Sequence, residues 1–406
     1  MDLVIVSDLH LGPGPSECVE SFYNDTAFAR FLDQMREDGR FRLVILGDFI
    51  DFLRAELVTN PDAEPMSEAI ALGTLDRVIE GHPKVFDALA RFLASGGTLD
   101  VVVGNHDAEL VRPVLQDRLR AALGPGVAFH RWIYHVPGVL YAEHGHQYDS
   151  RNCFSTFLEP FADDDGKVLE RPIGLYLFCE VERLNATLDP CPDHASHHFR
   201  YFALAARRRP REAAVVMRRT AGVAAATVRQ ARTMSSPERA ERRAAYRRHV
   251  LPAYADEIGL STRSLLAIDS LSAAPREPQR ALASQALHRM VPSRAIGPLG
   301  RRVKYLEDAS ISIHETLHLE RRDVPFYVFG HTHGAQHLPL DFGPSAPQYL
   351  NTGTWSSILR PTTETLRTIL PTFVHITAPE DGTPPTARLL AWNNANGAVE
   401  TLRRQA

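Results

Sequence analysis

LVIVSDLH, at residues 3–10, joins a short apolar run to an aspartate and a histidine. The same arrangement returns as LVILGDFID at residues 43–51 and as LDVVVGNHD at residues 99–107. Short, largely apolar runs of this kind are typical of strands that are buried on both faces of a sheet. We therefore expect three such strands, each followed by polar residues at its carboxyl end.

Two later segments follow the same rule with histidines at the strand end, VLYAEHGH at residues 139–146 and PFYVFGHTH at residues 325–333. Apolar residues with helical spacing at 26–37 and a second helical stretch at 85–93 separate the first three strands. An alternation of strands and helices predicts an α/β protein, and ligands of open α/β sheets bind beyond the carboxyl ends of the strands.

The pattern changes between the fourth and fifth motifs. From about residue 150 to residue 322 it is mostly helical and rich in alanine and arginine, and it contains no motif of the series. Strands are expected again from residue 325 onward, at 348–351, 372–376 and 388–392. The sequence therefore predicts a core formed by residues 1–150 and 323–406, which a helical insertion at 151–322 interrupts.

The composition is that of an ordinary globular protein, because 44% of the 406 residues are hydrophobic and 23% are charged. A net charge of −4 argues against a strongly charged partner for the chain as a whole. The four cysteines show no Cys-x-x-Cys spacing, and no apolar run reaches the roughly 20 residues that span a membrane. With a strand already at residues 3–6, we expect no signal peptide, reduced thiols and a cytosolic location.

The polar residues at the strand ends suit divalent cations. Imidazole and carboxylate together favour Mn²⁺, Fe or Zn²⁺ over Mg²⁺ or Ca²⁺, and Mn²⁺ is our first expectation. Asp8 and His10 are two residues apart and so face the same side, as do His331 and His333. Asp48 stands alone and is suited to bridge two cations about 3.5–4 Å apart, which activate water and clamp a phosphoryl oxygen.

The five motifs resemble those of the calcineurin-like metallophosphoesterase superfamily, D-x-H, G-D-x-x-D, G-N-H-[DE], H-G-H and G-H-x-H, over about residues 1–150 and 320–395. The resemblance implies a four-layer α/β/β/α sandwich and hydrolysis of a phosphate ester or anhydride by a hydroxide that bridges two metals. One metal would be held by Asp8, His10 and His333. The second would be held by Asn105, His144 and His331, with Asp48 shared between the two.

The resemblance also assigns roles near the metals. His106 would contact the phosphate and protonate the leaving oxygen, and Asp107 would hold the His106 ring in the required tautomer. Asn351 begins an Asn-x-Gly step that would support the last motif from behind. Two roles stay open: Asp51 either braces its loop or touches the site, and His146 either contacts substrate or only shapes the turn at Gly145.

Within the superfamily the chain is similar to the UDP-2,3-diacylglucosamine hydrolases, which share an S-D-x-H-L start and a helical cap after the fourth motif. That resemblance implies a phosphoanhydride bond in a UDP-lipid as the substrate, and the Arg-rich helices of the insertion would allow a peripheral position at the inner face of the membrane. The sequence departs from this branch in two ways. Its insertion is much longer, and its third motif has the general superfamily's histidine, His106.

The insertion carries a local excess of positive charge. Residues 200–250 contain only three acidic residues, and their 14 arginines are Arg200, Arg207, Arg208, Arg209, Arg211, Arg218, Arg219, Arg229, Arg232, Arg239, Arg242, Arg243, Arg247 and Arg248. Four interpretations remain open: solvated helix faces, contact with a membrane or acyl chains, binding of nucleic acid, and a seam between subunits of a homo-oligomer.

Three functions from different classes follow. The first is a metal-dependent hydrolase of a phosphoanhydride or phosphodiester in a UDP-lipid or a nucleotide. The second is a phosphodiesterase or nuclease that uses the arginines of the insertion to bind nucleic acid. The third is a scaffold without activity, which the complete set of expected ligands argues against.

Overall fold

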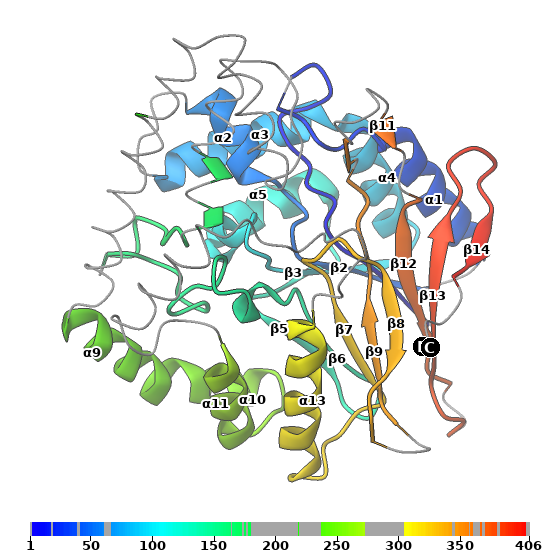
Figure 1. Cartoon of the computed structure of the whole chain (residues 1–406). Helices are drawn as coiled ribbons and strands as arrows, with labels where there is room; N and C mark the ends of the chain where they lie inside the picture. Colours follow the sequence, from blue (N-terminus) through cyan, green and yellow to red (C-terminus); the bar gives the residue numbers. More distant parts are fainter. Residues whose placement is uncertain are drawn as a thin grey trace.

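The computed structural model describes most of the chain (Figure 1). The described residues are 2–17, 19–38, 41–60, 66–163, 165–172, 174–175, 178–179, 218, 237–272, 304–342, 346–356, 358–359, 366–367, 370–379 and 382–402. The expected strands that carry the five motifs, and both helices expected between the first three of them, are present. The metal-site motifs all lie within the described residues.

The first sheet is mixed and has the strand order β14-β13-β12-β1-β2-β3-β4. Its parallel half consists of β1 (Asp2–Val6), β2 (Arg42–Leu46), β3 (Thr98–Val102) and β4 (Val127–His130). On the other side of β1 the strands are antiparallel, and they are β12 (Thr372–Thr377), β13 (Thr386–Trp392) and β14 (Val399–Thr401). The amino-terminal strand therefore lies in the middle of the sheet and is paired on both sides.

The second sheet is also mixed and has the order β5-β6-β7-β9-β8. Its strands are β5 (Ile133–Val136), β6 (Leu140–Glu143), β7 (Phe326–Phe329), β8 (Gln336–Pro339) and β9 (Gln348–Asn351). β6 and β7 pair in parallel although more than 180 residues separate them, with Leu140 opposite Phe326. This pairing brings the fourth and fifth motifs to the same end of one sheet. A separate ribbon joins β10 (Ile358–Leu359) to β11 (Leu366–Arg367).

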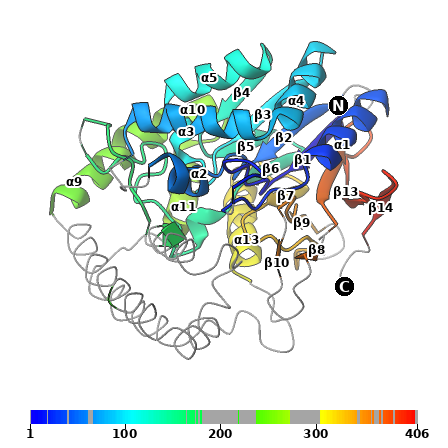
Figure 2. The ribbon, with the colours of Figure 1, turned by 90° about the horizontal axis from the view of Figure 1, so that it is seen from above.

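Helices between the motifs gather along one side of the molecule (Figure 2). They are α1 (Asp25–Asp38), α2 (Phe52–Thr59), α3 (Glu68–Gly81), α4 (Pro83–Ala94) and α5 (Pro113–Leu123), with a 3₁₀ turn η1 at Ala108–Val111. Val4 and Val6 of β1 belong to the same buried cluster as Phe28 and Phe31 of α1. One face of the first sheet is therefore covered by helices.

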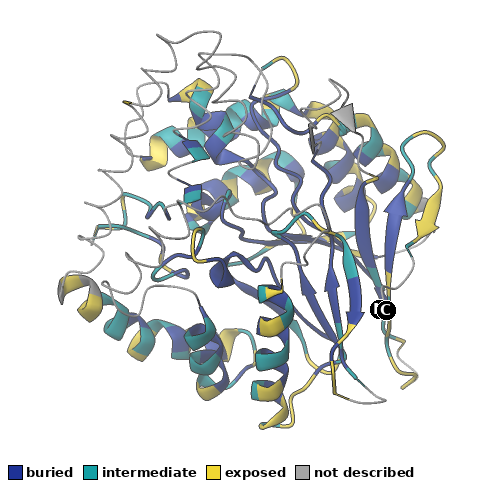
Figure 3. Ribbon diagram, viewed as in Figure 1, coloured by how far each residue is buried: buried dark blue, intermediate teal, exposed yellow. Residues whose placement is uncertain are grey.

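The opposite face of the first sheet packs against the second sheet. Leu3 and Ile5 of β1 share a buried cluster with Tyr134, Val328 and Leu350 of the second sheet. Because successive strand residues point to opposite faces, a fully apolar strand such as β1 can fill both cores. The burial pattern in Figure 3 follows the strands of both sheets. The structure thus confirms a mixed α/β protein with two mixed sheets.

The described helices of residues 237–318 join this core. They are α9 (Pro237–Ala245), a π-helical segment η3 (Tyr246–Val250), α10 (Leu251–Glu257), α11 (Thr262–Leu271) and α13 (Tyr305–His318). The Tyr254 hydroxyl accepts the Ile133 N–H of β5 at 2.8 Å, and His314 Nδ1 lies 3.0 Å from the Tyr327 hydroxyl of β7. No described helix is both long and apolar enough to cross a membrane. Residues 180–217, 219–236 and 273–303 of the expected insertion lie outside the described residues.

Three of the arginines counted in the insertion have partners inside the protein. Arg242 donates to the carbonyl oxygens of residues 161–163, at 3.0–3.1 Å. Arg243 and Arg247 bind the buried carboxylate of Asp269, at 3.0 and 2.7 Å. These three side chains serve folding and do not form a free basic surface, whereas Arg218 and Arg248 are exposed. Of the four cysteines, Cys153 and Cys179 are buried and are not joined in a disulfide.

A buried charge cluster fixes the loop that follows the first motif. Glu20 accepts backbone N–H groups of Gly12, Gly14 and Phe22, and its Oε2 lies 3.1 Å from His82 Nε2. The other ring nitrogen of His82 lies 2.8 Å from Asp25 Oδ1. Burial alone would lower the pKa of His82, but hydrogen bonds to Asp25 and Glu20 outweigh it and raise the pKa to about 9.

This cluster predicts a pH-dependent stability. The folded pKa of His82 lies above the unfolded value of 6.5, so its contribution is complete below pH 6.5 and is lost as the pH rises through about 9. The loss amounts to at most about 3 kcal/mol. Urea unfolding of the wild type and of His82→Gln at pH 6 and pH 9.5 checks it. The two free energies of unfolding should differ much more at pH 6, and an equal difference at both pH values would contradict the assignment.

Candidate metal centre

The five motifs meet at the carboxyl ends of strands from both sheets. β1, β2 and β3 are neighbours in the first sheet, and β6 and β7 are neighbours in the second. Cross-sheet bonds join their ends: the His331 N–H donates to Asp8 Oδ2 at 3.0 Å, and the Gly330 N–H donates to the His144 carbonyl at 3.1 Å. Segments more than 300 residues apart in the chain are thereby fixed against one another.

The backbone at this place is strained. Six non-glycine residues of the described chain have positive φ, and five of them are Asp8, His10, Asp48, His331 and His333, with φ between 51° and 66°. Such a conformation is uncommon for residues with a Cβ and persists only where the surroundings impose it. The strain falls on five of the seven residues that the motifs assign to metal binding, which links the conformation to the site rather than to general loop geometry.

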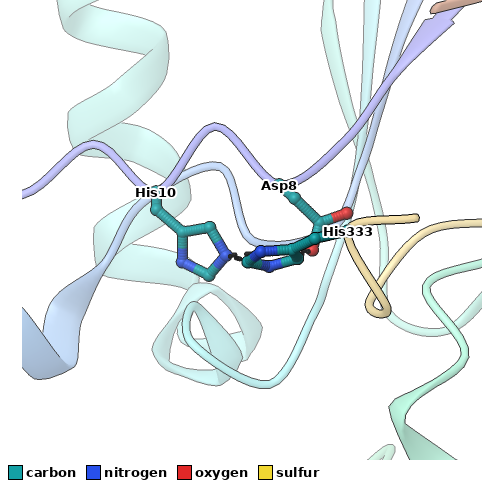
Figure 4. A group of neighbouring side chains, drawn as sticks. All are labelled: Asp8, His10 and His333. Carbon is teal, nitrogen blue, oxygen red and sulfur yellow. Dashed lines mark hydrogen bonds and ion pairs between the residues drawn. The ribbon is translucent and has the colours of Figure 1, made fainter. Parts of the chain in front are cut away.

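One group of candidate ligands consists of Asp8, His10 and His333 (Figure 4). His333 Nε2 lies 3.2 Å from Asp8 Oδ1 and 3.1 Å from His10 Nε2. Asp8 Oδ1 is buried and accepts no hydrogen bond from a described residue. A buried carboxylate oxygen without a donor, beside two imidazole nitrogens that face each other, is a donor set that a divalent cation would satisfy.

A second group consists of Asp48, His144 and His331. Asp48 Oδ2 lies 3.1 Å from His144 Nε2 and 3.6 Å from His10 Nε2, so this one carboxylate reaches both groups. Asn105 Oδ1 lies 3.1 Å from His144 Nε2. The structure therefore brings together all seven residues expected to hold metal, with Asp48 between the two groups.

His106 lies on the edge of the first group. Its backbone N–H donates to Asp48 Oδ1 at 2.8 Å, and its ring meets the His10 ring edge-on with centroids 4.6 Å apart. His10, Asp48 and His106 also form a third set of close donor atoms, so geometry alone does not separate His106 from the ligands. The expectation that His106 acts on substrate rather than on metal stays a prediction.

The prediction that Asp107 holds the His106 ring is wrong. Asp107 is fully buried and accepts the backbone N–H groups of Phe49 and Gly104, at 2.7 and 2.6 Å, so it joins two motif loops instead. Asp51 holds the ring, because its Oδ1 lies 3.1 Å from His106 Nδ1. Sequence adjacency therefore pointed to the wrong aspartate.

Asp51 both braces its loop and contacts residues of the site. Its Oδ2 lies 3.2 Å from His10 Nδ1, so one carboxylate orients a candidate ligand and His106 together. The same side chain caps α2 by accepting the Arg54 N–H at 3.0 Å. Helix capping fixes the carboxylate, and the fixed carboxylate then fixes two rings.

Asn351 and His146 are the remaining two residues expected near the site. Asn351 supports the last motif as expected, because its Nδ2 donates to the Gly330 carbonyl at 2.7 Å and to the Thr332 hydroxyl at 3.1 Å. His146 is buried, and its ring centroid lies 4.3 Å from that of Phe157. Neither of its ring nitrogens bonds to a described residue. The rings of His144 and His331 also lie beside it, with centroids 5.5 and 6.3 Å away, so contact with substrate and shaping of the turn at Gly145 both stay predictions.

Charges in the site are strongly coupled. Burial would raise the pKa of Asp8, but the imidazoles of His333 and His144 hold it well below its usual range. Burial would lower the pKa of His10, but Asp51 and Asp8 raise it to about 10, and Asp48 likewise helps to raise that of His144 to about 9. Protons balance the carboxylates when no cation is bound, so cation binding would release them.

The glycines of the motifs make room for these side chains. A Cβ on Gly104 would collide with Asp48 Oδ1, and a Cβ on Gly47 would collide with the His144 ring. At Gly330 it would lie 2.7 Å from Asp8 Oδ2. Three of the five motifs thus begin with glycine because a candidate ligand from another motif occupies the space that a side chain would need.

Comparison of the sequence with protein-family models gives no match, and comparison with curated proteins gives no significant match. The resemblance to metallophosphoesterases therefore rests on the motifs themselves. The geometry that the motifs adopt is independent support for a shared site, because a chance set of motifs would not converge on one place.

Gly104→Ala tests the packing that positions Asp48. The added methyl group must displace the Asp48 carboxylate, so we expect Mn²⁺ affinity to fall by roughly 10- to 100-fold, the loss typical of disturbed support around metal ligands. Isothermal titration calorimetry with Mn²⁺ measures it. Gly73→Ala in α3 is the matched control, since nothing lies within 4 Å of its added Cβ. Equal affinities for the two variants would contradict the proposed crowding.

Proposed function

We propose that the chain is a dinuclear-metal phosphoesterase of the calcineurin-like type. The observation that carries the proposal is Asp48, a buried carboxylate within 3.6 Å of imidazoles from both candidate ligand groups. A carboxylate shared in this way suits two cations about 3.5–4 Å apart. The donor set of carboxylate, amide oxygen and imidazole favours Mn²⁺, with Fe and Zn²⁺ as the next choices.

Fold details support the same proposal. The two packed sheets, with helices α1–α5 on one side and α10 and α13 contacting the other, are consistent with a four-layer α/β/β/α sandwich. We propose that residues 1–150 and 323–406 form that core and that residues 151–322 are an insertion, part of which supplies the second helical layer. We further propose a cytosolic enzyme.

When bound, two such cations would acidify water to give a nucleophile at neutral pH and would neutralise charge on phosphoryl oxygens. Residues of the chain supply the rest. Asp51 fixes His106 Nδ1, which leaves Nε2 as the nitrogen that can face a substrate. Held in this way, His106 is suited to donate a proton to the leaving oxygen. Phe178 flanks His106, with ring centroids 5.3 Å apart.

For the substrate we propose a phosphoanhydride or phosphodiester in a nucleotide-type molecule, with a UDP-lipid as the first candidate. Binding of nucleic acid, of a membrane or of a second subunit would need a free basic or apolar surface on the insertion. Arg242, Arg243 and Arg247 do not provide one, since they bind within the fold. Mass spectrometry of products from Mn²⁺-loaded protein decides among UDP-diacylglucosamine, nucleotide sugars, cyclic nucleotides and single-stranded DNA.

The role proposed for His106 predicts that its loss affects turnover and not metal binding. His106→Ala should still bind two Mn²⁺ ions while kcat falls by roughly 10²- to 10⁴-fold, the usual effect of losing a general acid. Metal content and turnover are measured on the same preparation with whichever substrate the panel identifies. His130→Ala is the matched control, because its ring pairs with Asp100 at 2.7 Å outside the site. Full activity of His106→Ala would show that the role is wrong, and loss of metal would make His106 a ligand.

A further inference from the structure

We infer that Asp149 is a positioning residue for the second cation, which it prepares by fixing the tautomer of His331. The inference rests on the proposed dinuclear site and adds to it a residue that no motif contains. Asp149 Oδ2 lies 3.4 Å from His331 Nε2, and both side chains are 8% exposed. The sequence offers no signal for it beyond its place five residues after His144.

Asp149 lies at the end of a short turn that begins just after the candidate ligand His144. His144 directly follows β6, which ends at Glu143, and the 3₁₀ turn η2 (His146–Tyr148) begins two residues later. The Asp149 N–H closes this turn on the His146 carbonyl at 3.1 Å. Asp149 and His144 both lie beside His331 of the fifth motif, which directly follows β7.

The carboxylate of Asp149 is itself held in place. Its Oδ1 accepts the Arg151 N–H at 3.0 Å, and its Oδ2 accepts Asn152 Nδ2 at 2.8 Å. The Arg151 guanidinium adds contacts at 3.3 and 3.4 Å. A carboxylate with this many donors has little rotational freedom, which is what a residue that orients another side chain requires.

The choice of tautomer follows from hydrogen-bond chemistry. A carboxylate only accepts, so the nitrogen that faces it, His331 Nε2, carries the proton. The neutral ring then keeps its lone pair on Nδ1, which is left for a cation beside Asp48 and His144. Metal-binding histidines commonly donate their other nitrogen to a carboxylate or carbonyl in this way.

Other histidines of the site follow the same rule with different acceptors. His144 turns Nδ1 to the Leu46 carbonyl at 2.9 Å, and His10 turns Nδ1 to Asp51 at 3.2 Å, so each presents Nε2 to the centre. His331 is reversed, because its acceptor is reached by Nε2. By elimination, Nδ1 of His331 and Nε2 of His144 are the ring nitrogens left for the second cation.

Metal titration tests the inference on the full-length protein. For Asp149→Ala we expect one of two Mn²⁺ sites to weaken by roughly 10- to 100-fold while the other is unchanged, as calorimetry and the electron paramagnetic resonance of free Mn²⁺ would report. Asp100→Ala is the matched control, because it removes a carboxylate that faces a different histidine, His130, at 2.7 Å. Its two sites should match the wild type.

The results distinguish the role of Asp149 from the dinuclear site on which that role rests. Two tight sites in Asp149→Ala would overturn the role of Asp149 and leave the dinuclear proposal standing. Fewer than two sites in the wild type would overturn both. Long-range ¹H–¹⁵N spectra of Zn²⁺-loaded, ¹⁵N-histidine-labelled wild type test the tautomer without any change at Asp149, with His331→Asn to assign the signal. A proton on Nε2 is expected, and a proton on Nδ1 would overturn the inference.

Discussion

The buried carboxylate of Asp48 is the constraint on which the site depends. Its Oδ1 accepts the His106 N–H at 2.8 Å, and its Oδ2 faces His144 at 3.1 Å and His10 at 3.6 Å. A buried charge is tolerated only with close compensation, and here that compensation comes from three other motifs. The positive φ of Asp48, 51°, and the glycines at positions 47 and 104 are what let the chain bring it there.

Much of this could be predicted because the polar motifs follow strands. Once LVIV, LVIL and LDVVV are read as parallel neighbours, their carboxyl ends must meet, and the ligands come together without further assumptions. The pairing of β6 with β7 extends the same logic across the insertion. Residue pairs inside the cluster could not be predicted in this way. Asp51 and Asp107 both lie near His106, and only the path of the loops decides which carboxylate meets its ring.

Other features that the sequence did not predict also depend on the path of the folded chain. Asp149 lies outside every motif, and its contact with His331 depends on a 3₁₀ turn that the sequence pattern does not reveal. Short strands such as β4, β5 and β8 have four residues each, too few for a clear period. Arg242, Arg243 and Arg247 look like a basic surface in the sequence, yet their partners are carbonyl groups and Asp269 of the fold. Charge density in a sequence does not distinguish a binding surface from internal pairing.

The central claim is that Asp48 is shared between two cations. Diffraction data from crystals grown with Mn²⁺, collected at the manganese absorption edge, test it most directly. If Asp48 is shared, the map will contain two anomalous peaks about 3.5–4 Å apart, one on each side of its carboxylate. A single peak, or peaks remote from Asp48, would contradict it.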